Sequence, residues 1–219
     1  MAITFYDVAH AVTGNLYRLM FGVSVKGREN IPETGGAILC SNHTSYYDPI
    51  ALAILTCRRK VNFMAKKELF ENPKFSRLIS SLGAFPVDRE GNDLKAIKTA
   101  LKILKDGGVL GIFPEGTRTP EMDLSKAKSG VVMFAIKAKV PIIPVYIESD
   151  YKLLKPLRIT IREPIYYDEY YGKKVSAEEY SELAKDVLRK IYGAEKSDSD
   201  EEDLEESEIQ EDKENSEKK

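Results

Sequence analysis

The chain has 219 residues, a formal net charge of −2 and 31% charged side chains, and this length suffices for one domain with a substantial hydrophobic core. Its two cysteines exclude a disulfide-rich scaffold, and with only two histidines they argue against a zinc site. The sequence lacks both the run of about 18 apolar residues that a transmembrane helix needs and the pattern of a cleavable signal peptide.

The N-terminal segment, residues 1–22, has apolar residues at helical spacing: Phe5, Val8, Val12, Leu16, Leu19 and Met20. We expect an amphipathic helix there, with an interruption at Thr13 and Gly14. The segment carries only two charged residues, Asp7 and Arg18. Its apolar face would pack on the domain or lie in one leaflet of a membrane, and the two placements are compatible.

Residues 23–194 alternate between predicted strands and helices. Strands are expected at residues 37–40, 61–65, 84–87, 109–113, 142–147 and 157–161. Helices are expected at residues 49–55, 73–82, 94–106, 126–139 and 177–192. Pro86 favours an edge position for its strand, because proline cannot donate to a ladder. We therefore predict a single α/β domain with a mainly parallel mixed sheet flanked by helices.

The C-terminal segment, residues 195–219, holds 13 acidic and 4 basic residues, a net charge of −9, and no aromatic residue. Such a segment buries too little apolar surface to offset chain entropy, so we predict that it is disordered. Because the whole chain carries −2, residues 1–194 carry +7. A basic body suits an anionic substrate or an anionic membrane surface. We see no nucleic-acid-binding motif, so nucleic acid is not an expected partner.

Side chains with useful chemistry follow four of the predicted strands. They are His43 after residues 37–40, Lys66 after 61–65, Arg89 after 84–87, and Glu115 with Arg118 after 109–113. In parallel sheets, ligands bind at the carboxyl ends of the strands. We therefore expect these side chains to share one edge of the sheet.

His43 and Asp48 have the chemistry of a general base and its orienting carboxylate. Imidazole titrates near neutrality, and a carboxylate on its second nitrogen would fix the tautomer. On a regular helix, five residues rotate by about 500°, which would leave the two side chains roughly 140° apart. Pro49 favours a turn between them, because it disfavours helical dihedrals at Asp48. Taken alone, residues 42–49 favour the simpler interpretation of a loop histidine beside a helix-capping aspartate.

Four sequence blocks occur in order: Asn42-His43 with Asp48, Gly83-x-Phe85 with Arg89, Phe113-Pro114-Glu115-Gly116-Thr117-Arg118, and Val140-Pro141-Ile142-Ile143-Pro144-Val145. They closely resemble the blocks of bacterial glycerophospholipid acyltransferases of the 1-acylglycerol-3-phosphate (lysophosphatidate) acyltransferase type. The Ala-Lys-x-Glu-Leu segment around Lys66 is also present, and Thr119 replaces a family serine while keeping its hydroxyl. The resemblance covers roughly residues 22–165, and four ordered motifs rarely coincide by chance.

The resemblance implies that His43 is the general base that deprotonates a glycerol hydroxyl, and that Asp48 orients His43. The resulting alkoxide would attack an acyl thioester directly, without an acyl-enzyme. Substrate binding is implied for Lys66, Arg89, Glu115, Gly116, Thr117 and Arg118. The three cations would hold the acceptor phosphate, and Glu115 with Gly116 would position the glycerol end. No metal or cofactor is implied, and the co-substrate would be a thioester of coenzyme A or of acyl carrier protein.

The implied reaction acylates lysophosphatidic acid to phosphatidic acid in phospholipid biosynthesis, at the cytoplasmic face of the cell membrane, by a peripheral or monotopic protein. Two alternatives stay open. One is a related acyltransferase that acts on another lysolipid acceptor. The other is a membrane interaction protein that kept the fold and lost activity, although the intact His43, Asp48, Glu115 and Arg118 argue against it.

Overall fold

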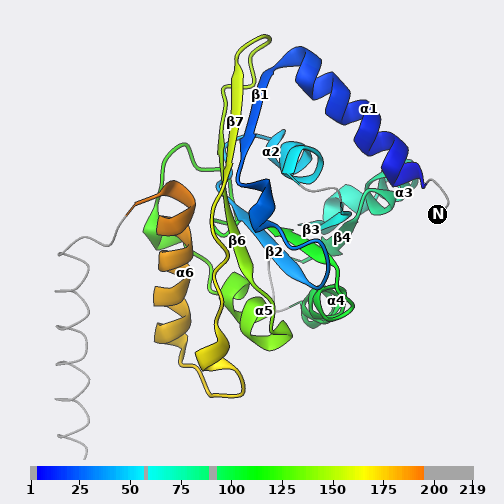
Figure 1. Cartoon of the computed structure of the whole chain (residues 1–219). Helices are drawn as coiled ribbons and strands as arrows, with labels where there is room; N and C mark the ends of the chain where they lie inside the picture. The colour runs from blue at the N-terminus through cyan, green and yellow to red at the C-terminus, as the bar shows by residue number, and fades with distance from the viewer. Residues whose placement is uncertain (1–3, 57–58, 89–92, 195–219) are drawn as a thin grey trace, which may run out of the picture.

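The computed structural model describes residues 4–56, 59–88 and 93–194. These residues form one seven-stranded sheet with the strand order β1-β7-β6-β2-β5-β3-β4 (Figure 1). The strands are β1 (Gly22–Lys26), β2 (Ala37–Ser41), β3 (Val61–Lys66), β4 (Ala84–Val87), β5 (Val109–Ile112), β6 (Ile142–Glu148) and β7 (Pro156–Ile161). The predicted α/β domain with a mainly parallel mixed sheet is therefore confirmed.

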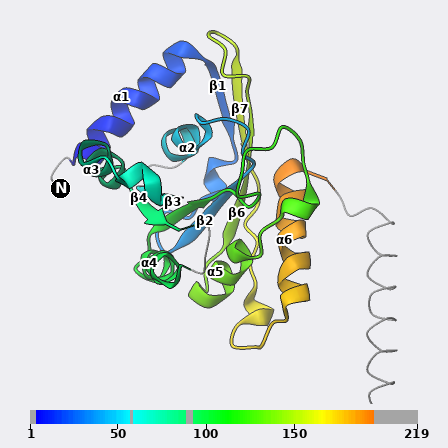
Figure 2. The same ribbon diagram turned by 180° about the vertical axis from the view of Figure 1, so that it is seen from behind.

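Helices cover both faces of this sheet (Figures 1 and 2). They are α1 (Phe5–Met20), α2 (Asp48–Ala51), α3 (Pro73–Ser81), α4 (Leu94–Lys105), α5 (Gly130–Ala138) and α6 (Ala177–Tyr192). The helix α2 continues into a π-helical turn, η2 (Leu52–Thr56), and short 3₁₀ turns are η1 (Arg28–Asn30), η3 (Lys67–Phe70), η4 (Leu124–Lys126) and η5 (Asp168–Tyr170). Successive side chains of a strand point to opposite faces of the sheet, so each strand can contact the helices on both faces.

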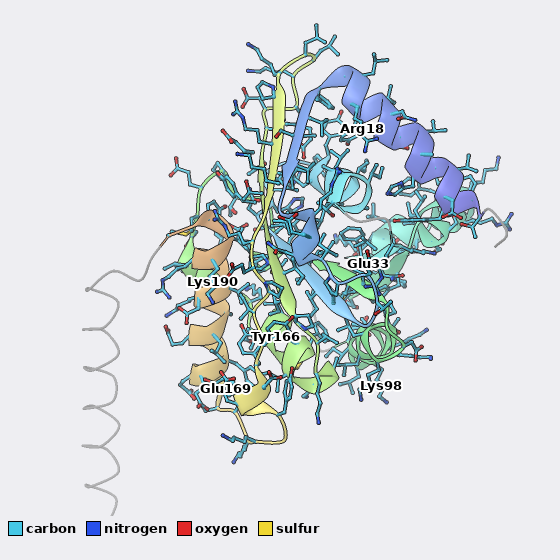
Figure 3. All side chains as sticks on the ribbon, viewed as in Figure 1. Arg18, Glu33, Lys98, Tyr166, Glu169 and Lys190 are labelled. Atoms are coloured by element: carbon cyan, nitrogen blue, oxygen red, sulfur yellow. The ribbon has the colours of Figure 1, made fainter. Side chains whose placement is uncertain are left out.

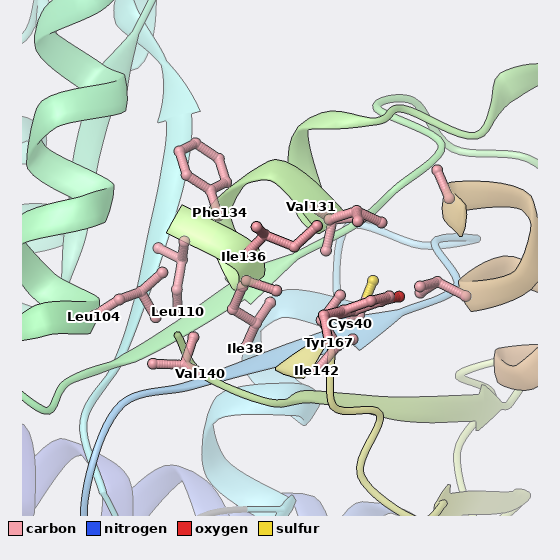
Figure 4. Close-up of a cluster of buried hydrophobic side chains, with 14 of the residues drawn as sticks. Ile38, Cys40, Leu104, Leu110, Val131, Phe134, Ile136, Val140, Ile142 and Tyr167 are labelled. Carbon is pink, nitrogen blue, oxygen red and sulfur yellow. The ribbon is translucent and has the colours of Figure 1, made fainter. Parts of the chain in front are cut away.

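The two faces bury two separate hydrophobic clusters. One cluster packs α1, α2 and η2 on the sheet through residues such as Tyr17, Leu52 and Leu55. The other packs α4, α5 and α6 on the opposite face, where Leu104, Val131 and Tyr167 meet Ile38 and Ile142 of the central strands (Figure 4). Charged side chains such as Lys98 of α4 and Lys190 of α6 lie on the outer surface (Figure 3). This three-layer arrangement explains why the central strands are apolar on both faces.

The strand directions determine where loops meet. Strands β6, β2, β5, β3 and β4 are all parallel, so their carboxyl ends share one edge of the sheet. Strand β7 runs antiparallel to β6 and is joined to it by the hairpin of residues 149–155. This hairpin projects beside the C-terminal end of α1 (Figures 1 and 2), where the Leu154 N–H donates to the Met20 carbonyl at 2.7 Å.

Several local predictions need correction. Helix α1 runs through Thr13 and Gly14 without interruption, because Gly14 is buried against Ile54 of η2 and lets the helix lie close. Strand β1 was not predicted, because only Val23 and Val25 of its five residues are apolar. The strand lies at an edge of the sheet, where none of its residues is fully buried. Helix α5 begins at Gly130 rather than at residue 126, because residues 124–126 form the separate turn η4.

Other predictions lie outside the described residues, among them Arg89 and the acidic segment 195–219. Within the described residues, none of the helices has both the length and the hydrophobicity needed to cross a bilayer.

Candidate active site

The loop after β2 brings His43 and Asp48 together. Strand β2 ends at Ser41, the Asp48 N–H donates to the Ser45 carbonyl at 3.2 Å, and α2 begins at Asp48 with Pro49 in its first turn. The chain therefore turns between the two residues, as Pro49 predicted. The His43 Nδ1 atom lies 3.0 Å from Asp48 Oδ2, which is hydrogen-bonding distance.

The carboxyl group of Asp48 is fully buried and surrounded by hydrogen-bond donors. Its Oδ2 atom accepts the backbone N–H of Thr44 at 2.7 Å and of Ser45 at 2.6 Å, in addition to the His43 contact. Its Oδ1 atom accepts the hydroxyl of Tyr151 at 2.7 Å. Both carboxyl oxygens therefore have hydrogen-bond partners, which compensates for their removal from water.

The ring of His43 is held by stacking as well as by Asp48. Its centroid lies 4.2 Å from that of Phe113, at an interplanar angle of 23°, and Phe113 stacks in turn on Phe63 at 6.3 Å. An ionised Asp48 can only accept, so it selects the tautomer that carries the proton on Nδ1. In that tautomer, Nε2 keeps its lone pair and can accept a proton from a hydroxyl.

Glu115 reaches the same loop from the turn after β5. It is almost fully buried, its Oε2 accepts the His43 backbone N–H at 3.3 Å, and its Oε1 accepts the Tyr192 hydroxyl at 3.4 Å. Burial raises the pKa of Glu115 above its usual value, although the nearby Thr119 hydroxyl and the hydrogen bonds from His43 and Tyr192 oppose this rise. The Thr119 N–H donates to the His43 carbonyl at 2.8 Å and ties the two loops together.

Arg118 lies exposed at the same edge, with its guanidinium carbon 3.4 Å from the centroid of the Tyr46 ring. This cation–π contact orients the planar fork that suits a phosphate group. Gly116 has a φ of +70°, a conformation that favours glycine, and thereby allows the tight turn before the exposed Thr117 and Arg118.

A cavity of about 550 Å³ opens beside this loop. Its lining includes Asn42, Thr44, Arg118, Thr119, Tyr146, Lys155, Arg158 and Tyr192. The cavity is therefore bounded by the loops after β2 and β5 and by the start of β7. Its cations are partly matched by carboxylates, since Glu148 and Asp150 also line it and Arg158 pairs with Glu148 at 3.2 Å. This mixed lining suits a polar ligand rather than a purely apolar one.

Lys66 ends β3 on the same edge of the sheet but stands apart from the His43 loop. Its exposed ammonium lies 3.5 Å from Glu68 Oε1, an ion pair within its own turn. The neighbouring Lys67 forms an ion pair with Asp88 at 2.5 Å, which joins the ends of β3 and β4. This partly exposed pair keeps Asp88, the residue before position 89, near the same edge.

Three further residues contribute to the site without having been predicted. Tyr151 comes from the hairpin after β6, Tyr192 from the end of α6, and Asn42, which the sequence gave no role, lines the cavity. The two tyrosines lie in no recognisable motif, and their distance along the chain hides their contacts with Asp48 and Glu115. Of the three, only Asn42 could have been selected from the sequence, because it directly precedes His43.

A family model described as Acyltransferase matches residues 22–148, more than half of the chain. The chain belongs to the acyltransferase family. A 1-acyl-sn-glycerol-3-phosphate acyltransferase from Bacillus subtilis is 36% identical over 154 residues, which cover 68% of this chain and 76% of the relative. The enzyme of that name from Streptococcus pneumoniae is 40% identical over 109 residues, covering 49% of this chain and 40% of its own length.

A solved structure agrees with these sequence relatives. The crystal structure of the 1-acyl-sn-glycerophosphate (LPA) acyltransferase from Thermotoga maritima superposes with a TM-score of 0.59 and 26% identity, covering 84% of this chain and 76% of that one. The family match ends at residue 148, so Tyr151 and Tyr192 of this acyltransferase lie beyond it.

The chemistry of this acyltransferase site is that of proton transfer and anion binding. Cys40 is fully buried in β2, and burial raises the pKa of its thiol far above the usual value, which makes it a poor nucleophile. Among the described residues, no cluster of His, Cys, Asp and Glu is arranged to hold a metal ion. The contact of the His43 Nδ1 atom with the buried Asp48 makes this imidazole the candidate base of the site.

Proposed function

We propose that this acyltransferase transfers a fatty acyl group from a thioester donor to the free hydroxyl of 1-acyl-sn-glycerol-3-phosphate, giving phosphatidic acid. The observation that carries the proposal is the 3.0 Å contact between His43 and the buried Asp48, on the sheet edge that also bears Arg118. The names of the relatives from Bacillus subtilis and Thermotoga maritima support the same acceptor.

The proposed reaction needs one base. The Nε2 atom of His43 takes the proton from the acceptor hydroxyl as its oxygen attacks the thioester carbonyl carbon, and Asp48 stabilises the imidazolium that forms. The carbon–sulfur bond then breaks, and the departing thiolate receives the proton from His43. The acyl group thus passes to the acceptor in one transfer, with a thiol as the second product.

The acceptor phosphate would bind at the cationic side of this edge. Arg118 is exposed and pre-oriented by Tyr46, which suits a bidentate contact with phosphate oxygens. Lys66 and Arg89 are proposed as further contacts, with Lys66 leaving its pair with Glu68 when phosphate binds. Glu115, Gly116 and Thr117 would place the glycerol end against His43.

We further propose that the protein binds the cytoplasmic face of the membrane through α1 and the hairpin after β6. Large apolar side chains are exposed on both elements: Phe5, Val8, Val12, Leu16, Leu19, Leu153 and Leu154. Arg18 of α1 is exposed, and the exposed Lys152 and Lys155 flank the hairpin leucines. Exposed leucines bordered by cations fit an anionic leaflet.

The test is acyl transfer by the purified full chain with lysophosphatidic acid and two donors, acyl-coenzyme A and acyl carrier protein thioester. Other lysolipids serve as competing acceptors. We expect phosphatidic acid as the product, and a loss of about 10²–10⁴-fold in kcat for His43→Ala. Exclusive acylation of another lysolipid would refute the acceptor, and full turnover in His43→Ala would refute the base.

A further inference from the structure

The hairpin after β6 sends one side chain back into the active site. Tyr151 donates its hydroxyl to Asp48 Oδ1 at 2.7 Å, across 103 positions of sequence. We propose that Tyr151 is a positioning residue that fixes Asp48 against His43 and sets the pH range of acyl transfer. The inference rests on the proposed base and orienter, and it adds a residue from outside the region that matches the family model.

The two carboxylate oxygens of Asp48 accept different numbers of hydrogen bonds. The Oδ2 atom has three donors, from His43, Thr44 and Ser45. The Oδ1 atom has the hydroxyl of Tyr151. A buried carboxylate oxygen that loses its donor keeps a negative charge that is no longer compensated, at a large desolvation cost. Tyr151 therefore compensates this charge and holds Oδ1 in place while Oδ2 faces His43.

The phenol of Tyr151 is suited to this task over the whole working pH range. Burial, with the charge of Asp48 as a second cause, raises the pKa of Tyr151 far above the usual value. The hydroxyl thus stays protonated and can only donate to the carboxylate at working pH. The interaction is that of a neutral donor with an anion, which is among the stronger hydrogen bonds.

The backbone and ring of Tyr151 are held in place. Its ring packs edge-on against Phe21 at 5.9 Å and lies 5.3 Å from Tyr47. Its φ is +52°, an unusual conformation for a residue other than glycine, and its N–H donates to Ser149 Oγ at 2.9 Å. Such strain persists only where the surroundings enforce it, and it often marks a functional position.

Other titratable groups near Asp48 do not take this role. Burial, together with the charges of Tyr47 and Asp48, raises the pKa of Tyr17 of α1 to about 12, but its hydroxyl is directed to the Tyr47 carbonyl at 3.5 Å. Tyr192 of α6 donates to Glu115. Both phenols are neutral at working pH, and neither donates to Asp48.

The direction of the effect follows from the lost donor. In Tyr151→Phe the negative charge of Asp48 is less compensated, so the carboxylate pairs more strongly with a protonated His43. The acid limb of kcat/KM should move to higher pH, and kcat should fall about 10- to 100-fold because the carboxylate is no longer fixed. The KM for lysophosphatidic acid should change little, since the phenol is bonded to Asp48.

The experiment compares wild type, Tyr151→Phe and the matched control Tyr17→Phe, which removes a buried phenol near the same carboxylate. Acyl transfer is measured against pH, and the imidazole titration of His43 is followed by NMR without substrate. We expect the acid limb and the His43 midpoint to rise in Tyr151→Phe alone. An unmoved midpoint in Tyr151→Phe, or an equal rise in Tyr17→Phe, overturns the role of Tyr151.

The NMR measurement separates this inference from the proposed function. If the wild type acylates no lysophosphatidic acid, the proposed function fails, yet the His43 midpoint still reports whether Tyr151 controls the pair. If the wild type is active and the midpoint of Tyr151→Phe equals that of the wild type, only the role of Tyr151 fails. The single missing hydroxyl keeps the ring packing, and thermal unfolding of both variants checks that they remain folded.

Discussion

The side-chain amide of Asn42 is joined to the backbone of Ile147 by two hydrogen bonds. Its Nδ2 donates to the Ile147 carbonyl at 2.9 Å, and the Ile147 N–H donates to its Oδ1 at 2.8 Å. The register of β2 with β6 ends at the pair Ser41 and Val145, so the amide replaces the next peptide group of the ladder. The main chain can therefore leave the sheet at Asn42 and turn toward His43, while the Asn42 side chain keeps the start of this loop bonded to β6.

Replacing Asn42 by Asp should destabilise the fold and lower activity. An ionised carboxylate cannot donate to the Ile147 carbonyl, so this buried acceptor loses its donor and faces a buried charge that keeps only the Ile147 N–H from this pair of hydrogen bonds. We expect a loss of about 2 kcal/mol or more in the free energy of unfolding, measured by urea denaturation at pH 8. The control is Asn15→Asp at an exposed position of α1. Equal midpoints for both variants would contradict the role assigned to Asn42.

Glu115 should make stability depend on pH. Because burial raises its pKa in the folded chain, the native state holds this proton more tightly than the unfolded state does. The free energy of unfolding therefore falls as the pH rises from the unfolded-state pKa of about 4.5 through the raised folded-state pKa. Glu115→Gln lacks this loss, so its stability relative to wild type should be greater at pH 8 than at pH 5. If the free energies of unfolding of Glu115→Gln and wild type, measured by denaturation, differ by the same amount at pH 5 and pH 8, this prediction is wrong.

The same variant should lower acyl transfer, because Gln at position 115 alters the acceptor beside the His43 backbone N–H. A gain in relative stability at pH 8 together with a loss in kcat would show that the buried carboxyl group is kept for function. A variant that is no more stable and fully active would assign Glu115 no special part in the site.

The sequence allowed the centre of this site to be predicted, because its central residues lie close to strand ends. His43 follows β2 and Glu115 follows β5, and these strands are parallel neighbours, so their loops meet. Pro49 gave the turn that brings Asp48 back to His43. Tyr151 and Tyr192 could not be predicted, since their contacts span 103 and 77 positions and depend on how the hairpin and α6 pack.

Local errors in the prediction also have physical causes. Leu94 has the helical spacing of Leu101 and Leu104 in α4, yet it is 65% exposed in the first turn of the helix, whereas Leu104 is buried. Periodicity assigns a direction to a side chain, while burial also requires a neighbouring element. The exposed apolar face of α1 shows the same limit, since the pattern predicted the helix but not which part of it the domain would cover.

Arg118 should contribute mainly to acceptor binding. Arg118→Ala removes the guanidinium that lies over Tyr46, and we expect a rise of about tenfold or more in the KM for lysophosphatidic acid with a smaller change in kcat. Arg118→Lys should recover only part of the loss, because an ammonium lacks the planar fork. Arg77→Ala, at an exposed position of α3, is the control. A fall in kcat at constant KM would point instead to a role in the transition state.

Membrane binding should depend on two leucines from different elements. Leu19 of α1 is 78% exposed and Leu154 of the hairpin is 77% exposed, and the Leu154 N–H bonds to the residue after Leu19. Deleting residues 1–22 would also remove Tyr17 and Phe21 from the core, so point variants are the sharper test. Leu19→Glu and Leu154→Glu leave that core intact while placing a charge where the leaflet would lie.

We expect both variants to float several-fold less with vesicles that contain phosphatidylglycerol, because each inserts a carboxylate into apolar surroundings. Leu94→Glu is the matched control, since Leu94 is similarly exposed at 65% but belongs to α4. Flotation of the wild type should also weaken at high salt, because Arg18, Lys152 and Lys155 would contact anionic head groups. If Leu94→Glu loses flotation as much as Leu19→Glu does, or if neither hairpin nor helix variant loses any, this face of the protein does not bind the membrane.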